Sequence, residues 1–177
     1  MAERTIQIPE DVELRQEGKA LAVKGPKGQL TREFIHGKIK IAVKDKKLLI
    51  SSEEDRRQIK AIVGTWAAII NNMILGVSKG WKCEMKLVFS HFPAKMSLKD
   101  GEFVIQNFLG ERAPRSAKLF PDVSVKIDKE NIIITGADKE RVGLAAGKIE
   151  KVTKIVGYDR RIFQDGCFIV KHPYLEN

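Results

Sequence analysis

The chain has 177 residues, of which 43% are hydrophobic and 31% charged, and its formal net charge is +9 at pH 7. This hydrophobic fraction excludes a disordered chain, and the length allows one domain or two small ones. The surplus of cations favours a polyanionic partner. Nucleic acid is favoured over an anionic membrane, because neither of the two long helices expected below has a face rich in Lys and Arg.

The cysteines and histidines have spacings that no metal site uses. Cys83 and Cys167 form no CxxC pair, and His36, His91 and His172 are scattered. We therefore expect free thiols in or near packed cores, no metal and no cofactor. Residues 1–13 contain no apolar targeting segment, and no apolar run approaches the roughly 18 to 20 residues of a membrane span. We expect a cytoplasmic protein with no membrane partner.

The first half of the chain predicts strands followed by one helix. Strands are expected at residues 12–16, 20–24 and 30–34, and a hairpin with alternating apolar residues at 39–51. Ser51 and Ser52 precede three acidic residues, which is an N-cap signal. The helix that follows carries apolar residues at helical spacing: Ile59, Ile62, Val63, Trp66, Ile70, Met73 and Ile74.

The second half predicts a similar series. Strands are expected at residues 83–90 and 102–106, with a less regular continuation toward Phe120, and a hairpin at 123–135. Asp138 is the expected N-cap of the second helix. The apolar stripe of that helix consists of Val142, Ala146, Ile149, Val152 and Val156.

The two halves match as an internal repeat. Residues 39–51 lie over 123–135 at an offset of 84, and residues 21–28 lie over 103–110 at an offset of 82. Gly64 falls on Gly147 with one gap, where we expect each helix to approach its sheet closely. The sequence thus predicts an α+β protein made of two tandem two-layer copies, residues 1–80 and 81–177, each with an antiparallel sheet packed on one long helix.

Several motifs that suggest chemistry have simpler explanations. GLAAGK at residues 143–148 is one residue short of a phosphate-binding loop and lies inside the expected helix. GEFVIQNF at residues 101–108 resembles a base-stacking strand, but its aromatic residues are expected in the core. His91 is expected to pack or cap, since no nucleophile or carboxylate pair accompanies it. We expect no enzyme and no small-molecule substrate.

Two basic segments of the second copy are the candidate RNA sites. Residues 148–163 hold five cations (Lys148, Lys151, Lys154, Arg160, Arg161) against Glu150 and Asp159, so 5 − 2 gives a net +3. The loop at 107–121 adds Arg112, Arg115 and Lys118 together with Gly110 and Pro114, which favours phosphate contact over a solvated loop. In the first copy, KGPKG at residues 24–28 is explained equally well as a plain turn.

At these loops the sequence resembles the family of large-subunit ribosomal protein six, in its archaeal and eukaryotic branch. The resemblance is carried by VKGPKG (residues 23–28), SHFP (90–93), NFLGER (107–112) and RIFQDG (161–166), and it covers nearly the whole chain. Cys167 and Phe168 stand where the branch usually has an aliphatic residue and Tyr, which puts a tyrosine hydroxyl contact in doubt. The resemblance implies a duplicated α+β fold that binds 23S-type rRNA mainly through the second copy. It places the protein near the stalk base and the sarcin-ricin loop, beside neighbouring ribosomal proteins.

On that basis we expect one set of RNA-binding residues. The cations Arg112, Arg115, Lys118, Lys154, Arg160 and Arg161 would contact phosphates. Asn107 and Gly110 would allow close backbone approach, and Tyr158 or Phe163 would pack on a sugar or base. Two alternatives stay open at this point. The first copy could have little role in RNA binding and dock neighbouring proteins, and the chain could be an RNA-binding regulator outside the ribosome.

Overall fold

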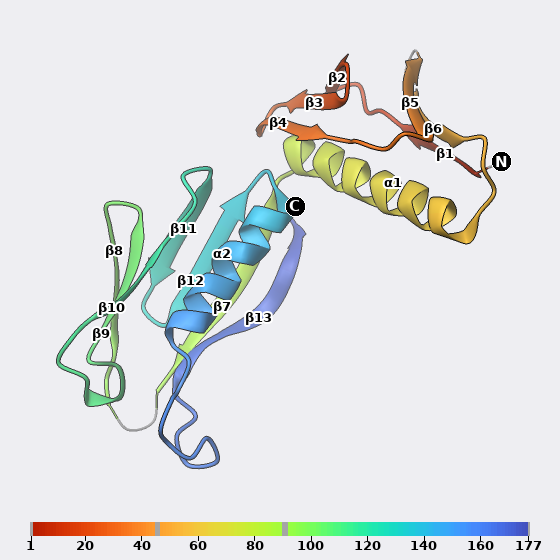
Figure 1. Cartoon of the computed structure of the whole chain (residues 1–177). Helices are drawn as coiled ribbons and strands as arrows, with labels where there is room; N and C mark the ends of the chain where they lie inside the picture. Colours follow the sequence, from red (N-terminus) through yellow and green to blue (C-terminus); the bar gives the residue numbers. More distant parts are fainter. Residues whose placement is uncertain (1, 45–46, 90–91, 177) are drawn as a thin grey trace. The chain divides into compact units, whose positions relative to one another are not determined.

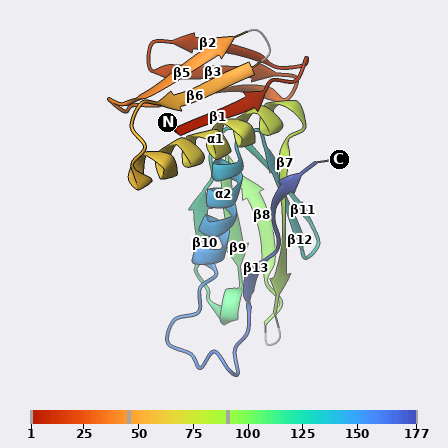
Figure 2. The ribbon, with the colours of Figure 1, turned by 90° about the vertical axis from the view of Figure 1, so that its right-hand side faces the viewer.

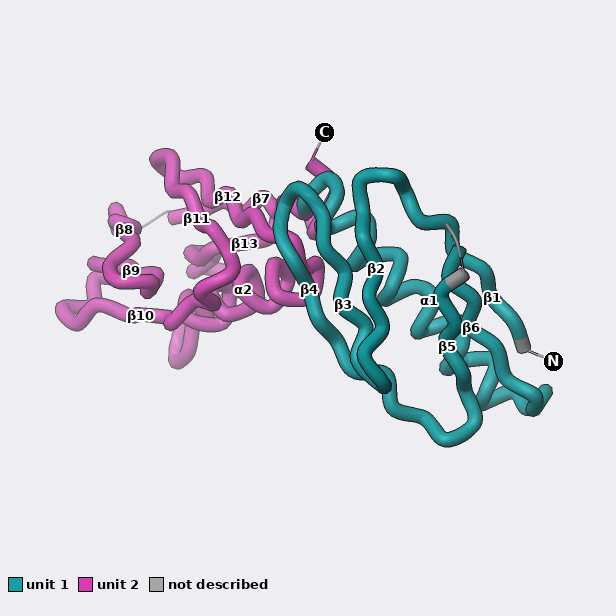
Figure 3. Tube along the Cα trace, turned by 90° about the horizontal axis from the view of Figure 1, so that it is seen from above, with its two compact units in different colours: residues 1–80, 177 teal, residues 81–176 magenta. Residues whose placement is uncertain are grey.

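The structure, a computed structural model, describes residues 2–44, 47–89 and 92–176. The chain divides into two compact units, residues 1–80 and 81–176 (Figure 3). Each unit contains one long helix and two small antiparallel sheets (Figure 1). The predicted class, a duplicated α+β unit, is confirmed, with the difference that the strands of each copy form two sheets rather than one.

Unit 1 packs helix α1 (Arg57–Ser78) against both of its sheets. One sheet has the order β1-β6-β5 and the other β2-β3-β4. The strands are β1 (Ala2–Gln7), β2 (Glu13–Glu17), β3 (Ala20–Gly25), β4 (Gly28–Glu33), β5 (Ile39–Lys44) and β6 (Lys47–Ser52). The core between these layers includes Leu21, Val23, Leu48, Ile50, Ile70 and Val77, all almost fully buried.

Unit 2 repeats this plan around helix α2 (Lys139–Val152) and adds one strand. Its sheets have the orders β10-β9-β8 and β11-β12-β7-β13. The strands are β7 (Trp81–Val88), β8 (Lys95–Lys99), β9 (Glu102–Gln106), β10 (Arg115–Lys118), β11 (Val123–Asp128), β12 (Asn131–Gly136) and β13 (Gly166–Leu175). A short 3₁₀ turn, η1 (Phe108–Gly110), follows β9.

The repeat is confirmed down to strand register. Ile39 of β5 pairs with Ser52 of β6, and Val123 of β11 pairs with Gly136 of β12. Each residue of the second pair lies 84 positions after its counterpart, so the paired strands of the two hairpins have the same register. The upstream offset of 82 holds as well, since β2 and β3 begin at residues 13 and 20 and β8 and β9 at residues 95 and 102.

The predicted N-cap was correct for one helix and wrong for the other. The Asp138 carboxylate accepts a hydrogen bond from the Glu140 amide at 2.8 Å, as expected of an N-cap. In unit 1, Ser51 and Ser52 belong to β6, and the Ser52 hydroxyl donates to the Lys38 carbonyl at 2.8 Å. Pairing with two neighbouring strands keeps these serines extended, so α1 begins only at Arg57.

Three further expectations from the sequence were wrong. Helix α2 ends at Val152, which leaves Val156 outside it and 73% exposed. A Cβ atom at Gly64 or Gly147 would meet no heavy atom within 4 Å, so neither glycine marks a close approach to a sheet. Helix α1 is long and apolar enough, by length and composition, to cross a membrane. Packing against the sheets of unit 1 buries one stripe of this helix, which includes Ile59, Val63, Ile70 and Ile74.

The expected state of the cysteines is confirmed. Cys83 and Cys167 are free and buried, and burial raises the pKa of their thiols to about 11 and about 12.

The end of the chain forms strand β13 as far as Leu175. Its second half pairs with β7 through Lys171 and Tyr174. The Tyr174 hydroxyl donates to the Glu84 carboxylate, which also lies 3.2 Å from Lys171 Nζ. These two donors lower the pKa of Glu84 to about 2.

We predict that Gly25→Ala destabilises unit 1 by about 1 to 3 kcal/mol, the usual cost of overpacking. An added Cβ would lie 2.7 Å from the Val77 backbone oxygen, so the β3–β4 turn or the end of α1 would have to move. Gly64→Ala is the matched control, and it should be neutral or stabilise by up to about 1 kcal/mol because alanine is the better helix former. Urea unfolding of the full chain measures both, and equal effects would contradict the packing.

We predict that Glu84 contributes stability that depends on pH. Because its pKa falls from 4.5 to about 2 on folding, the contribution is complete above about pH 5 and is lost as the pH falls toward 2. The difference in urea midpoint between the wild type and Glu84→Gln should therefore shrink over that range. A difference that does not change with pH would show that the carboxylate charge is not involved.

Candidate nucleic-acid interface

The loop between β9 and β10 is longer than its counterpart in unit 1. Strand β3 turns into β4 through two residues, Pro26 and Lys27, whereas β9 ends at Gln106 and β10 begins at Arg115, which leaves residues 107–114 between them. We call these residues the long loop. Its counterpart in unit 1 is held close to the helix by the Lys27 amide, which donates to the Val77 carbonyl at 2.8 Å.

The long loop has a constrained backbone. Asn107, Leu109 and Gly110 have φ values of 56°, 53° and 77°, in the left-handed region. Phe108 and Leu109 are nevertheless buried, and the Asn107 side chain donates to the Pro93 carbonyl at 3.1 Å. A Cβ at Gly110 would also lie 3.3 Å from the Phe92 ring, so a larger residue there would need both a left-handed backbone and a small movement of that ring. Buried side chains thus hold the loop in one conformation.

The segment between α2 and β13, residues 153–165, is the second addition of unit 2, and we call it the basic segment. The Thr153 hydroxyl accepts a hydrogen bond from the Cys167 amide at 2.9 Å, which joins the two ends of the segment. In its middle, the Asp159 carbonyl accepts from the amides of Ile162 and Phe163 at 3.0 and 2.9 Å. The rings of Tyr158 and Phe163 lie 4.8 Å apart.

Arg115 connects the long loop to the basic segment. Its Nε and Nη2 donate to the Glu111 carboxylate at 2.8 and 2.5 Å, and its Nη1 donates to the carbonyls of Val152 and Lys154 at 2.9 and 3.0 Å. The guanidinium also lies over the Phe108 ring, 4.8 Å from its centre. This pairing lowers the pKa of Glu111 and raises that of Arg115. The Val152 carbonyl, which ends α2 and has no partner within the helix, is therefore capped by a cation from strand β10.

The other cations of this end are exposed. Arg112 and Arg160 form no ion pair with any residue in the described ranges. Arg161 has a side chain that is 92% exposed, and its Nε lies 3.4 Å from the Asp159 carboxylate. Lys154 is exposed at the start of the basic segment. With Glu111 neutralised by Arg115, this surface carries a surplus of positive charge that a polyanion can use.

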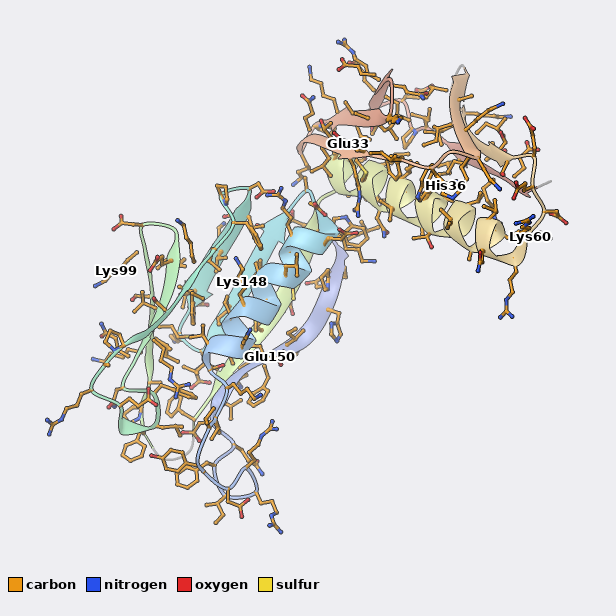
Figure 4. All side chains as sticks on the ribbon, viewed as in Figure 1. Glu33, His36, Lys60, Lys99, Lys148 and Glu150 are labelled. Atoms are coloured by element: carbon orange, nitrogen blue, oxygen red, sulfur yellow. The ribbon has the colours of Figure 1, made fainter. Side chains whose placement is uncertain are left out.

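The structure brings most of the predicted site residues to one end of unit 2, where the long loop and the basic segment lie together (Figures 1 and 2). Lys118 lies at the other end of β10, about 10 Å along the strand from Arg115 at 3.3 Å per residue. Its carbonyl accepts a hydrogen bond from Lys148 at 3.1 Å. Lys148 is on α2 (Figure 4). RNA contact by any of these residues stays a prediction.

Sequence reasoning missed the apolar groups at this end. Phe92 and Phe168 are 42% and 41% exposed, and Ile162 is 63% exposed. Phe92 lies in a loop and Ile162 in a turn, where periodicity assigns no face, and Phe168 lies in β13, a strand that the sequence did not predict. Phe103 and Phe108, in contrast, are buried, which confirms their predicted place in the core. Ser90 and His91 lie outside the described residues, so the predicted role of His91 is not addressed.

A cavity of about 720 Å³ opens at the same end, between the last turns of α2, the basic segment and the start of β13. Lys151, Arg160, Phe163 and Phe168 are among the residues that line it. Within the described part of the chain, no three side chains among His, Cys, Asp and Glu are grouped so that they could hold a metal ion.

We predict that Arg115→Met destabilises unit 2 by about 2 kcal/mol, because it leaves the Glu111 carboxylate and two carbonyls without their donor. Arg112→Met, which removes an exposed cation from the same loop, should change the stability by less than about 0.5 kcal/mol. Urea unfolding tests both variants. Faster amide hydrogen exchange in residues 107–114 is expected for Arg115→Met alone, and equal exchange in the two variants would contradict the linking role.

Comparisons with known proteins agree with this architecture. The sequence model of the family described as Ribosomal protein L6 matches residues 8–80 and 92–166, one match in each repeat. The chain is 46% identical over 168 residues to a protein of Methanothrix thermoacetophila, covering 95% of the chain and 96% of that protein. It is 46% identical to a protein of Ignicoccus hospitalis (93% and 91% covered) and 43% identical to one of Methanosarcina mazei (95% and 96%). All three are named large ribosomal subunit protein uL6. The resemblance noted in the sequence is thus confirmed, and the chain belongs to the ribosomal protein L6 family.

Proposed function

We propose that the chain is a structural constituent of the large ribosomal subunit and binds 23S-type rRNA through the loop end of unit 2. Family membership supports the first part, since the relatives named above are large-subunit proteins of the ribosome. It also agrees with a cytoplasmic, ribonucleoprotein location and with a role in translation that is not enzymatic. The rRNA site rests on the geometry of unit 2.

The observation that carries the proposal is where unit 2 differs from unit 1. The hairpins and helices repeat, while the long loop replaces a two-residue turn of unit 1, and the basic segment and β13 have no counterpart there. Hydrogen bonds of Arg115 and Thr153 join these three additions at one end of the unit. That end also exposes Arg112, Arg160 and Arg161. A binding site is often built from segments added to a common fold. The segments found only in unit 2 meet at one basic surface, as expected of such a site.

Recognition would depend mainly on the shape of the RNA. An A-form helix hides its major groove from side chains but displays phosphates and 2′-hydroxyls, which a rigid basic surface can contact. Arg112, Arg160 and Arg161 would bind phosphates in pairs of hydrogen bonds. Arg115 would act as a positioning residue for the two loops, because most of its donors have partners inside the protein. The Tyr158 and Phe163 rings would pack on a sugar or base.

We place this surface near the stalk base and the sarcin-ricin loop, beside neighbouring large-subunit proteins. The family resemblance supports that location. A rigid basic surface suits this location, because a protein there must hold folded RNA in one arrangement.

Unit 1 has a different surface, which favours contact with neighbouring proteins. Helix α1 contains no charged residue from Ala61 to Ser78, although Ala61, Thr65, Ala68 and Asn71 on it are exposed. A helix face turned to water normally carries charges, and α2 carries six in its 14 residues. We infer that this uncharged face docks a ribosomal protein rather than RNA, since phosphate binding needs cations.

We predict that Arg160→Ala with Arg161→Ala lowers the affinity for a large-subunit rRNA fragment. The plot of log affinity against log salt should become shallower by about 1.5, because two phosphate contacts are lost. Arg56→Ala with Arg57→Ala removes the same charge from unit 1 and is the matched control. An unchanged affinity and slope in the first variant would exclude the basic segment from the site.

We predict that residues 81–177 alone retain most of the rRNA affinity of the full chain, measured with the same fragment. Retention supports the docking role of unit 1. A loss comparable to that of the Arg160 and Arg161 variant would instead make unit 1 part of the RNA site.

A further inference from the structure

The cavity at the loop end of unit 2 has the size of a small-ligand site. Its volume of about 720 Å³ lies within the range of roughly 300 to 1,000 Å³ that such sites occupy. It is formed by the last two turns of α2, by the basic segment and by the beginning of β13. Two of these three elements are additions of unit 2, so unit 1 has no equivalent of this cavity.

The walls of the cavity combine three kinds of group. Phe163, Phe168 and Ile155 provide apolar faces. Lys151, Lys154 and Arg160, all exposed, supply positive charge. Gln164, which is exposed, adds a neutral polar group that can exchange hydrogen bonds. Aromatic faces next to cations form the surface on which proteins stack unpaired nucleotides.

Gly147 forms an open part of the cavity wall. It lies in the interior of α2, where glycine costs up to about 1 kcal/mol relative to alanine. No packing compensates for this cost, because a Cβ at residue 147 would meet no heavy atom within 4 Å. Gly147 lines the cavity, so the missing side chain keeps the helix wall open to a ligand.

We propose that this cavity receives one unpaired base of the rRNA. This inference rests on the proposed function. The base would stack on Phe163 or Phe168 and lie against the α2 backbone at Gly147. The cations Lys151, Lys154 and Arg160 would hold the adjoining phosphates. A paired base cannot enter, because its faces are covered within the helix, so the cavity selects a loop, a bulge or an end of the RNA.

The experiment compares affinity and salt dependence for a large-subunit rRNA fragment and the full chain. Gly147→Leu should fold well, since leucine is the better helix former, and its side chain would occupy the cavity. We expect an affinity about tenfold lower with an unchanged salt slope, because a stacked base is lost but no phosphate contact. Phe163→Ala with Phe168→Ala, which removes both rings, should behave in the same way. Gly64→Leu, at the other open helical glycine, is the matched control and should bind like the wild type.

A second measurement locates the base directly. Short-wave ultraviolet light joins bases to aromatic side chains on which they stack, and mass spectrometry of the joined peptides should identify Phe163 or Phe168. Unchanged affinity of Gly147→Leu, or cross-links that avoid both residues, would overturn the base site and leave the proposed rRNA binding intact. If the wild-type chain fails to bind the fragment, the proposed function itself is wrong and the base site falls with it.

Discussion

The loop end of unit 2 depends on the hydrogen bonds of Arg115. The guanidinium donates to carbonyls at the end of α2 and, through its other nitrogens, to Glu111 in the long loop. A helix end leaves carbonyl groups without partners, and a cation placed there is favoured by the helix dipole as well. Because Glu111 balances the charge, the arginine can lie partly buried at a tolerable desolvation cost. Two segments almost 40 residues apart are thereby held as one rigid surface.

Duplication explains why that surface can be added without loss of the fold. Each unit completes its own layers, and each buries an apolar helix stripe against its sheets. The connections between strands are then free to change in length, as the β3–β4 turn and the long loop show. Unit 2 has a longer loop, a basic segment and an extra strand at its sheet edge. Unit 1 has the short turn and an uncharged helix face.

The sequence predicted the regular parts of the fold well. The hairpins of both copies follow from alternating apolar residues, and their constant offset of 84 fixed the register that β5–β6 and β11–β12 share. Strands β1, β8 and β13 were missed. β8 has few apolar residues, and irregular pairing interrupts the alternation in β13. The start of α1 was misplaced because Ser51 and Ser52 are typical N-cap residues in the sequence. In the structure they belong to β6 and pair with its neighbouring strands.

The candidate site was predicted in its location but not in its internal roles. Local clusters of Arg and Lys pointed to the two segments that the structure brings together. Charge alone could not separate Arg115, which has partners inside the protein, from Arg112 and Arg160, which face solvent. The sequence predicted that α2 approaches its sheet closely at Gly147. That prediction was wrong because a sequence shows the small side chain but not that the space beside it is open. The cavity could not be foreseen, since it forms between three elements.

The central claim, that the chain is a component of the large ribosomal subunit, is tested most directly by sedimentation of a cell extract. The protein should travel with large subunits and with whole ribosomes, and high salt should release it, as expected of a basic protein bound to RNA. Recovery in the soluble fraction at physiological salt, apart from the subunits, would contradict the account.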